Sequence, residues 1–244
     1  MDQGRMAVSE TGRTTQGKGK TEEIKGGQNM RVMLMEATAF PDEICGRAAA
    51  VCTDSENYAS ALKHAVESGH TSVLEHAVFT FQVEGISRAA LAQLTRHRLA
   101  SFDVQSQRYV KLDNPELVIP NSILNLKTEL RDQAMVCLED SMKMYQKLLD
   151  AGVPAEDARY VTPQAVPTKL IMTMNARELL HFFSLRTCNR AQWEIRKMAD
   201  KMLETCMKVA PEIFKYAGPG CVTGKCPEKR PCGKPRNADE WNED

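Results

Sequence analysis

Three arginines and one histidine fall within fourteen residues, 96–109 (R-H-R-L-A-S-F-D-V-Q-S-Q-R-Y), of a chain whose formal net charge is zero. Arginine presents a planar fork of donors that suits phosphate, and closely spaced cations repel one another unless an anion offsets their charge. The segment therefore predicts a local anion-binding site.

The spacing also predicts the geometry of that site. If the residues before the segment form a helix, one helix face carries Gln93, Arg96 and His97. If the residues after it are extended, one side of the strand carries Val104, Ser106 and Arg108. A helix face and a strand face would then meet at one polar pocket.

The surrounding sequence predicts the elements that position these residues. Residues 31–38 predict a strand, and the alternation of Phe79, Phe81 and Val83 with polar residues predicts another with one buried face. Helices are expected at about 55–69, 86–98, 126–151 and 175–209, and residues 103–112 are expected to be extended. The first helix is capped by Ser55 and ended by Gly69. The last helix starts at a capping box of Asn175 and Glu178 and is broken near Asn189. Because strands and helices do not alternate regularly, the sequence favours an α+β fold, with a mixed or antiparallel sheet packed with long helices, over a doubly wound sheet.

The chain divides into three parts by composition. Residues 1–29 are rich in Gly, Thr, Lys and Glu and predict a disordered N-terminal extension. Residues 30–217 carry the periodic patterns and predict a single domain. Residues 218–244 are rich in Cys, Gly and Pro and predict a flexible C-terminal tail.

Charge and hydropathy exclude several function classes. The 32 basic and 32 acidic residues argue against a general nucleic-acid surface, since such domains usually carry a net positive charge. No run approaches the ~18 consecutive apolar residues of a membrane span, and the N-terminus lacks the apolar core of a secretory signal. We therefore expect a cytoplasmic protein that binds neither nucleic acid nor membranes.

Five ordered blocks resemble the flavin-dependent thymidylate synthases. One is the R-H-R triplet, followed by Ser106 and then x-R-Y. The others are G-H-T-S-V-L-E-H (69–76), G-V-P-A-E-D-A-R (152–159), N-A-R-E-L-L-H-F-F-S-L-R (175–186) and R-A-Q-W-E-I-R (190–196). The likeness covers about residues 30–217, which are thereby identified as a domain of this family.

The resemblance implies a homotetramer that binds FAD at sites built from several subunits. It implies that dUMP becomes dTMP, with 5,10-methylenetetrahydrofolate as carbon donor and NADPH as reductant. Reduced flavin supplies the hydride, so folate leaves as tetrahydrofolate. The cofactor carries the hard chemistry, and the protein supplies orientation and charge.

The resemblance also assigns roles to individual residues. Those matching flavin contacts are Ser72, Arg96, His97, Arg98, Val104, Asn175, Arg177 and His181. Those matching the dUMP site are Gln93, Leu94, Thr95, Arg96, Val104, Gln105, Ser106, Gln107, Arg108, Arg159 and Arg186. Arg186 matches the catalytic arginine that binds the uracil ring and favours its form ionised at N3, where a guanidinium stabilises the developing charge. The chain departs from the signature at Asp103-Val104, where Asn-Glu is common, and at His181, where some members have Asn.

Several residues also allow other interpretations. We expect His76 to be a structural core histidine, whereas His97, between two arginines, should not be buried without a ligand. Ser106 lacks a recognisable base and is assigned to substrate binding rather than nucleophilic attack. The chain has no Pro-Cys-His segment, which disfavours a thymidylate synthase with a cysteine nucleophile.

Two further functions remain open on sequence. One is a nucleic-acid-binding module with a basic R-H-R loop and a metal-binding cysteine tail. The other is a related flavoprotein that methylates a different uracil-containing substrate. In the tail, zinc would need four thiolates, with Cys206 joining Cys221, Cys226 and Cys232. The spacing lacks C-x-x-C, so a reduced tail without metal is preferred.

Overall fold

The computed structural model describes residues 30–224 and 226–241, so the predicted N-terminal extension lies outside the described residues. Four strands form one sheet in the order β1-β2-β4-β3, and every neighbouring pair is antiparallel. The strands are β1 (Arg31–Ala37), β2 (Val78–Ser87), β3 (Ala100–Val104) and β4 (Pro167–Asn175). The predicted α+β class with an antiparallel sheet is confirmed.

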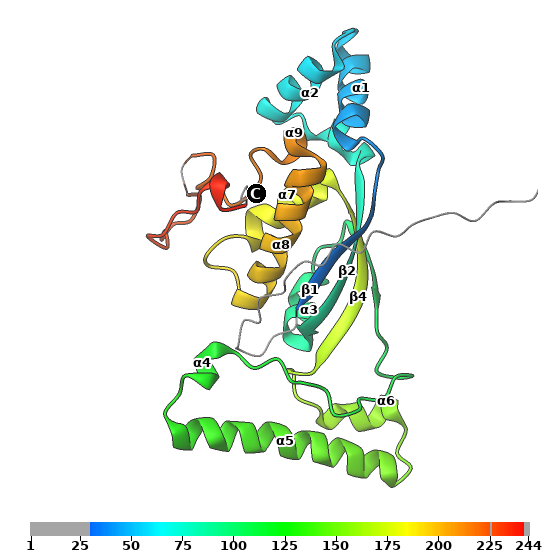
Figure 1. Ribbon diagram of the computed structural model, residues 1–244, viewed down its shortest axis with the longest axis vertical. Coiled ribbons are helices and arrows are strands. Elements are labelled where there is room, and N and C mark those ends of the chain that lie inside the picture. The colour runs from blue at the N-terminus through cyan, green and yellow to red at the C-terminus, as the bar shows by residue number, and fades with distance from the viewer. Residues whose placement is uncertain (1–29, 225, 242–244) are drawn as a thin grey trace, which may run out of the picture.

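Helices gather on one side of this sheet and at both of its ends (Figure 1). The α-helices are α1 (Pro41–Thr53), α2 (Tyr58–Glu67), α3 (Arg88–Leu94), α4 (Asn121–Leu124), α5 (Thr128–Asp150), α6 (Ala155–Ala158), α7 (Ala176–Arg186), α8 (Trp193–Val209) and α9 (Pro211–Phe214). Short 3-10 helices are η1 (Thr71–His76), η2 (Arg159–Val161) and η3 (Ala238–Trp241). Helices α7 and α8 lie against the sheet, and their buried faces enclose the core with β2 and β4.

Alternation along β2 places Phe79, Phe81 and Val83 in the core, as predicted. Phe79 and Phe183 both meet the Phe214 ring edge-on, at centroid distances of 5.5 and 5.8 Å. This geometry suits the aromatic quadrupole and fixes α7 and α9 against β2. The sheet and α7 thus form a rigid base for the residues at their ends.

Some of the predicted helix ends are confirmed and others are wrong. The break between α7 and α8 is confirmed, and Gly69, with φ of 73°, ends the turn after α2 as predicted. The predicted cap Ser55 is wrong, because Asn57 accepts the N–H of Ser60 and begins α2 instead. Helix α1 was not predicted.

The elements around the arginine cluster are shorter than predicted. Helix α3 ends at Leu94 rather than residue 98, and β3 spans 100–104 rather than 103–112. The extended backbone stops because strand pairing with β4 stops at Val104, after which residues 107–109 form a turn. The predicted strand face through Ser106 and Arg108 is therefore wrong.

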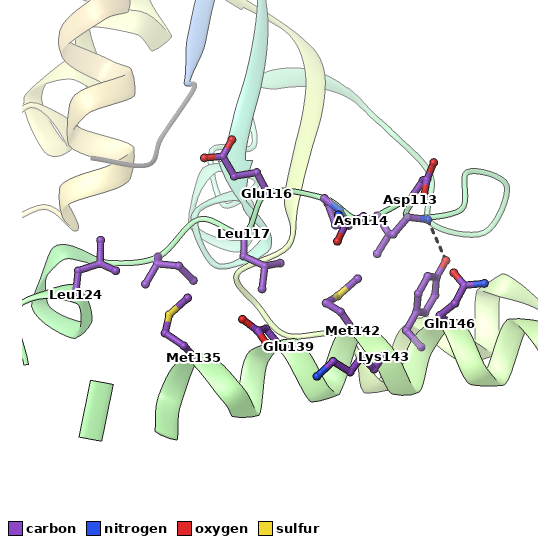
Figure 2. Close-up of a pocket in the computed structure, with 14 residues that line it drawn as sticks. Asp113, Asn114, Glu116, Leu117, Leu124, Met135, Glu139, Met142, Lys143 and Gln146 are labelled. Atoms are coloured by element: carbon purple, nitrogen blue, oxygen red, sulfur yellow. Dashed lines mark hydrogen bonds between the residues drawn. The ribbon is translucent and has the colours of Figure 1, made fainter. Parts of the chain in front are cut away.

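Helix α5 lies apart from the sheet at the opposite end from α1 and α2 (Figure 1). Its one buried residue is Tyr145, whose hydroxyl accepts the N–H of Leu112 at 3.1 Å. Leu130 and Val136 remain more than half exposed. Figure 2 shows the cavity of about 770 Å³ between this helix and residues 112–124, lined largely by apolar side chains such as Met135 and Met142.

None of the helices within residues 30–224 and 226–241 is both long and apolar enough to cross a membrane.

Candidate functional site

A cavity of about 760 Å³ opens where the chain leaves α3 and where α7 begins. Its lining brings together six of the predicted flavin contacts and the predicted catalytic Arg186; the six are Arg96, His97, Arg98, Asn175, Arg177 and His181. Glu75, Leu99, Glu178 and Leu185 also line it. Arginines from two segments far apart in sequence therefore face one space, as a site for a large anion requires.

His97 stands at the base of this cavity in a chain of hydrogen bonds. Its Nε2 accepts from Nε of Arg186 at 3.1 Å, so its Nδ1 carries the proton and donates to Glu178 Oε1 at 3.0 Å. The His97 and Glu178 side chains are only 3% and 6% exposed. The expectation that His97 would not be buried without a ligand is wrong, because Glu178 accepts the hydrogen bond of the buried imidazole.

Burial lowers the pKa of His97, and the nearby Arg186 lowers it further, whereas the hydrogen bond to Glu178 acts in the opposite direction. The imidazole is therefore neutral, as its acceptance of a hydrogen bond from Arg186 requires. A neutral ring leaves the full charge of the Arg186 guanidinium facing the cavity. His76, expected in the core, is exposed.

We predict that stability falls on acidification because of His97. Its folded pKa is depressed, so below about 6.5 the unfolded chain binds a proton that the folded chain refuses. This contribution is complete above about pH 6.5 and is lost as the pH falls toward the folded pKa. Denaturant unfolding should show this slope in wild type and in the exposed control His64→Gln, but not in His97→Gln. The same slope in His97→Gln would contradict the assignment.

The start of α7 supplies both a cap and ligand-binding groups. Asn175 Oδ1 accepts the N–H of Glu178 at 2.9 Å, which confirms the predicted N-cap. Glu178 does not complete a capping box, because its carboxylate reaches His97 instead. Asn175 also lines the cavity, beside Arg177, which is paired with Glu75 of η1.

Two arginines, Arg88 of α3 and Arg159 of η2, mark a second cavity, of about 460 Å³. The predicted substrate residues Thr95, Gln107 and Arg159 line it, together with Arg88, which the sequence analysis missed. Burial lowers the pKa of Arg88, and the neighbouring Arg159 lowers it further. The cavity thus presents two cations that repel each other until an anion lies between them.

Glu156 joins the R-H-R segment to the block that ends in Arg159. Its carboxylate accepts from Nε of Arg108 at 2.7 Å, while its backbone carbonyl accepts from Nε of Arg159 at 2.9 Å. Ser106 Oγ accepts the N–H of Arg108 at 3.2 Å and stabilises the turn between them. Two blocks that are distant in sequence therefore meet beside the second cavity.

The two cavities lie on either side of the end of α3, since neighbouring residues line different ones: Thr95 the smaller and Arg96 the larger. The spacing of these residues predicts one pocket, whereas the structure has two. The predicted site residues that line neither are Ser72, Gln93, Leu94, Val104, Gln105, Ser106 and Arg108. Leu94 is fully buried, so it does not face either cavity within the single chain.

Four residues that position the site were not predicted: Glu75, Arg88, Glu156 and Glu178. Three of them lie inside the matched blocks, where only Glu178 was given a role, as part of a capping box. The arginine cluster itself could have indicated the three glutamates, because closely spaced arginines without a ligand need nearby carboxylates to offset their charge.

Comparisons with known proteins agree with this geometry. The family described as "Thymidylate synthase complementing protein" matches residues 33–212. A "Flavin-dependent thymidylate synthase" of Geobacter sulfurreducens is 47% identical over 222 residues, covering 84% of this chain and 94% of that protein. The protein of the same name from Pyrococcus furiosus is 50% identical over 171 residues, covering 66% of this chain and 69% of that protein.

A solved structure is similar as well. The UMP/dUMP methylase PolB from Streptomyces cacaoi, bound with 5-Br dUMP, superimposes with a TM-score of 0.67 and 28% sequence identity. The match covers 78% of this chain and 97% of that one.

Proposed function

This chain belongs to the family of flavin-dependent thymidylate synthases, and we propose that it methylates dUMP to dTMP with FAD, 5,10-methylenetetrahydrofolate and NADPH, releasing tetrahydrofolate. The observation that carries the proposal is the pair of cation-lined cavities on either side of the end of α3. A dinucleotide cofactor and a nucleotide substrate are both anions that must lie side by side. A cytoplasmic location accompanies this proposal, since all eight cysteines are free thiols, as in reducing compartments.

The larger cavity fits FAD by its donor set. Its 760 Å³ falls within the range of about 300–1,000 Å³ typical of ligand pockets. Arg96 and Arg98 are exposed and suited to a pyrophosphate, and the Asn175 amide and the His181 ring add further polar groups. When bound, the flavin supplies the hydride that reduces the transferred carbon to a methyl group.

The smaller cavity fits the phosphate of dUMP. Arg88 and Arg159 supply charge, and Gln107 supplies a neutral donor. Arg108 stands nearby, where Glu156 orients its guanidinium. PolB, whose structure this chain resembles, holds 5-Br dUMP, which supports a pyrimidine nucleotide as the ligand.

Arg186 is proposed to stabilise negative charge on the uracil ring. Its Nε is engaged by His97, so the two terminal nitrogens of the guanidinium remain as donors. Within one chain it lines the larger cavity and not the smaller one. We therefore propose that it acts on a nucleotide bound at a junction between subunits.

A homotetramer would also cover two surfaces that the single chain leaves exposed. One is the outer sheet face, where Met33 and Ile171 lie on either side of Gln82 and are 54% and 38% exposed. The other is α5, whose apolar residues have few partners within the chain. Burying such surface drives obligate association.

We predict that the protein sediments at about four times its 27.3 kDa chain mass. Ile171→Lys should shift it toward smaller species, because a charge would be buried at the interface. Val51→Lys is the control, since Val51 is 83% exposed on α1, away from both surfaces. A fully active monomer in wild type would refute the shared-site proposal.

We predict that the residues at the second cavity contribute unequally to the affinity for dUMP. Arg159→Ala should raise the Kd for dUMP by about 10–100-fold, since a charge-assisted hydrogen bond contributes about 1.5–3 kcal/mol. Ser106→Ala should raise it about tenfold or less and leave turnover measurable. Arg131→Ala, a surface arginine of α5, is the control. Loss of turnover in Ser106→Ala with normal dUMP affinity would instead make Ser106 a nucleophile.

The function is tested by product analysis. The protein is incubated with FAD, NADPH and 5,10-methylenetetrahydrofolate, with either dUMP or UMP as acceptor. Formation of dTMP supports the proposal, and methylation of UMP in preference to dUMP would favour the alternative uracil-containing substrate, as the name of PolB allows. Tight binding of RNA or DNA without methylation would favour the nucleic-acid module.

A further inference from the structure

The C-terminal segment, residues 218–224 and 226–241, packs against α8 and the end of α7 (Figure 1). It lies outside residues 33–212, which match the family model. Trp241 of η3 is buried, and its indole N–H donates to Asp200 of α8 at 3.0 Å. The segment is therefore docked on the domain, in contrast to the flexible tail expected from its composition.

A cavity of about 620 Å³ lies between this segment and the end of α7. Four cysteines line it, namely Cys188, Cys221, Cys226 and Cys232, whereas Cys206 is buried in the core. Across the residues that the structure describes, no three His, Cys, Asp or Glu side chains are placed so that they could hold a metal ion. The zinc site considered for this segment from its sequence therefore finds no support.

Arg236 makes contacts that join the segment to both helices. Its Nη1 donates to the backbone carbonyl of Thr187 at 2.9 Å and to Asp200 Oδ1 at 2.7 Å. Its Nε donates to Glu240 Oε2 at 2.8 Å, and its guanidinium lies over the Trp241 ring, 4.4 Å from the centroid. The side chain is only 12% exposed. Because the guanidinium is planar and rigid, these partners together fix its orientation.

Thr187 is the residue on which α7 ends. It is fully buried, and both its N–H and its hydroxyl donate to the carbonyl of Phe183, at 3.1 and 2.6 Å. Its own carbonyl is one of those that a helix leaves without an intrahelical partner at its C-terminal end. Arg236 supplies a charged donor to that carbonyl, and a cation at this end also suits the helix dipole. Arg236 thus completes the end of α7 from outside the helix.

Arg186, which directly precedes Thr187, projects from this last turn of α7. Its Nε donates to His97, and it lines both the larger anion cavity and the cavity beside the C-terminal segment. The precision with which its guanidinium is placed depends on how firmly the surrounding residues hold it. Arg236 itself lines neither of the two anion cavities.

We propose that Arg236 is a positioning residue for Arg186 and acts through the carbonyl of Thr187. The inference rests on the proposed function, in which Arg186 stabilises negative charge on the uracil ring. A displacement of about 1 Å at a reacting group can cost about 100-fold in rate, so even a small shift at the end of α7 should be measurable in turnover.

The test is a double-mutant cycle on the dUMP-dependent oxidation of reduced flavin by the full-length protein. Arg236→Ala should lower kcat about tenfold, while KM for dUMP and FAD content stay within about twofold of wild type. Adding Arg236→Ala to Arg186→Ala should lower turnover by less than about twofold more, because the group that Arg236 positions is already gone. Arg236→Lys should restore part of kcat, since an ammonium can still donate to Thr187.

Arg190→Ala is the matched control. Arg190 also joins the connection after α7 to the C-terminal segment, by donating to the carbonyl of Arg230 and pairing with Glu228 at 3.9 Å. Its loss leaves the hydrogen bond from Arg236 to Thr187 in place, so we expect turnover within about twofold of wild type. A tenfold loss in this control would show that docking of the segment in general supports turnover, and would overturn the specific role of Arg236.

Hydrogen exchange supplies a measurement that does not depend on turnover. Amides at the end of α7 should exchange at least about fivefold faster in Arg236→Ala than in wild type or Arg190→Ala. Wild type that forms no dTMP would refute the proposed function itself. With an active wild type, unchanged turnover or unchanged exchange in Arg236→Ala, or a further tenfold loss in the double variant, would overturn this inference alone.

Discussion

Replacing Arg186 with alanine is expected to lower turnover by about 30- to 900-fold while FAD stays bound. The guanidinium is oriented by its Nε–H bond to His97, and its terminal donors face the larger cavity. Losing one strong electrostatic donor to developing charge costs about 2–4 kcal/mol of transition-state stabilisation. Lysine should rescue only part of this loss, since an ammonium cannot reproduce the planar fork.

The measurement is the rate at which reduced flavin is oxidised on adding dUMP and 5,10-methylenetetrahydrofolate, in wild type, Arg186→Ala and Arg186→Lys. FAD content and denaturant unfolding are recorded for each, because Arg186 also contacts the buried His97. Arg131→Ala serves as the control arginine. Near-normal turnover in Arg186→Ala would make this residue a solvated arginine rather than the activating group.

Replacing Glu178 with alanine is expected to lower the free energy of unfolding by about 3 kcal/mol. The buried Nδ1–H of His97 would lose its acceptor, and an unpartnered buried group costs about 1–3 kcal/mol, or more where a charge is involved. The variant should also bind FAD weakly, because His97, a proposed flavin contact, would lose the partner that holds its ring at the cavity.

Glu178→Gln is the matched variant, because its carbonyl oxygen can still accept from His97. We expect it to lose only about 1 kcal/mol, the net contribution of a typical hydrogen bond. Denaturant unfolding and FAD titration measure both effects. Equal stability of wild type and Glu178→Ala would show that His97 finds another partner and that the hydrogen-bond chain does not support the site.

The sheet and the long helices could be predicted because their signals are periodic. Phe79, Phe81 and Val83 alternate, and the face of α8 repeats at helical spacing. Helix α3 was overextended because Thr95 to Arg98 carry no Gly or Pro to mark its end. The end is set instead by tertiary contacts, since His97 turns toward Glu178 on α7.

The sequence motifs indicated which residues belong to the site, but not how these residues are arranged around the cavities. Seven of the residues that the blocks assigned to the site line one cavity, but the blocks gave no indication that Thr95 and Arg96 face different cavities. The roles of Glu178 and Glu156 depend on contacts across 81 and 48 residues of sequence, which no local pattern reveals. Composition likewise predicted a loose tail, because it cannot show that Trp241 finds Asp200.

An anaerobic single turnover tests the central claim most directly. Protein loaded with FAD is reduced, freed of excess reductant and mixed with dUMP and 5,10-methylenetetrahydrofolate. We expect the flavin to be reoxidised with formation of dTMP and tetrahydrofolate in equal amounts. Failure to bind FAD, or formation of dihydrofolate in step with dTMP while the flavin stays reduced, would contradict the account.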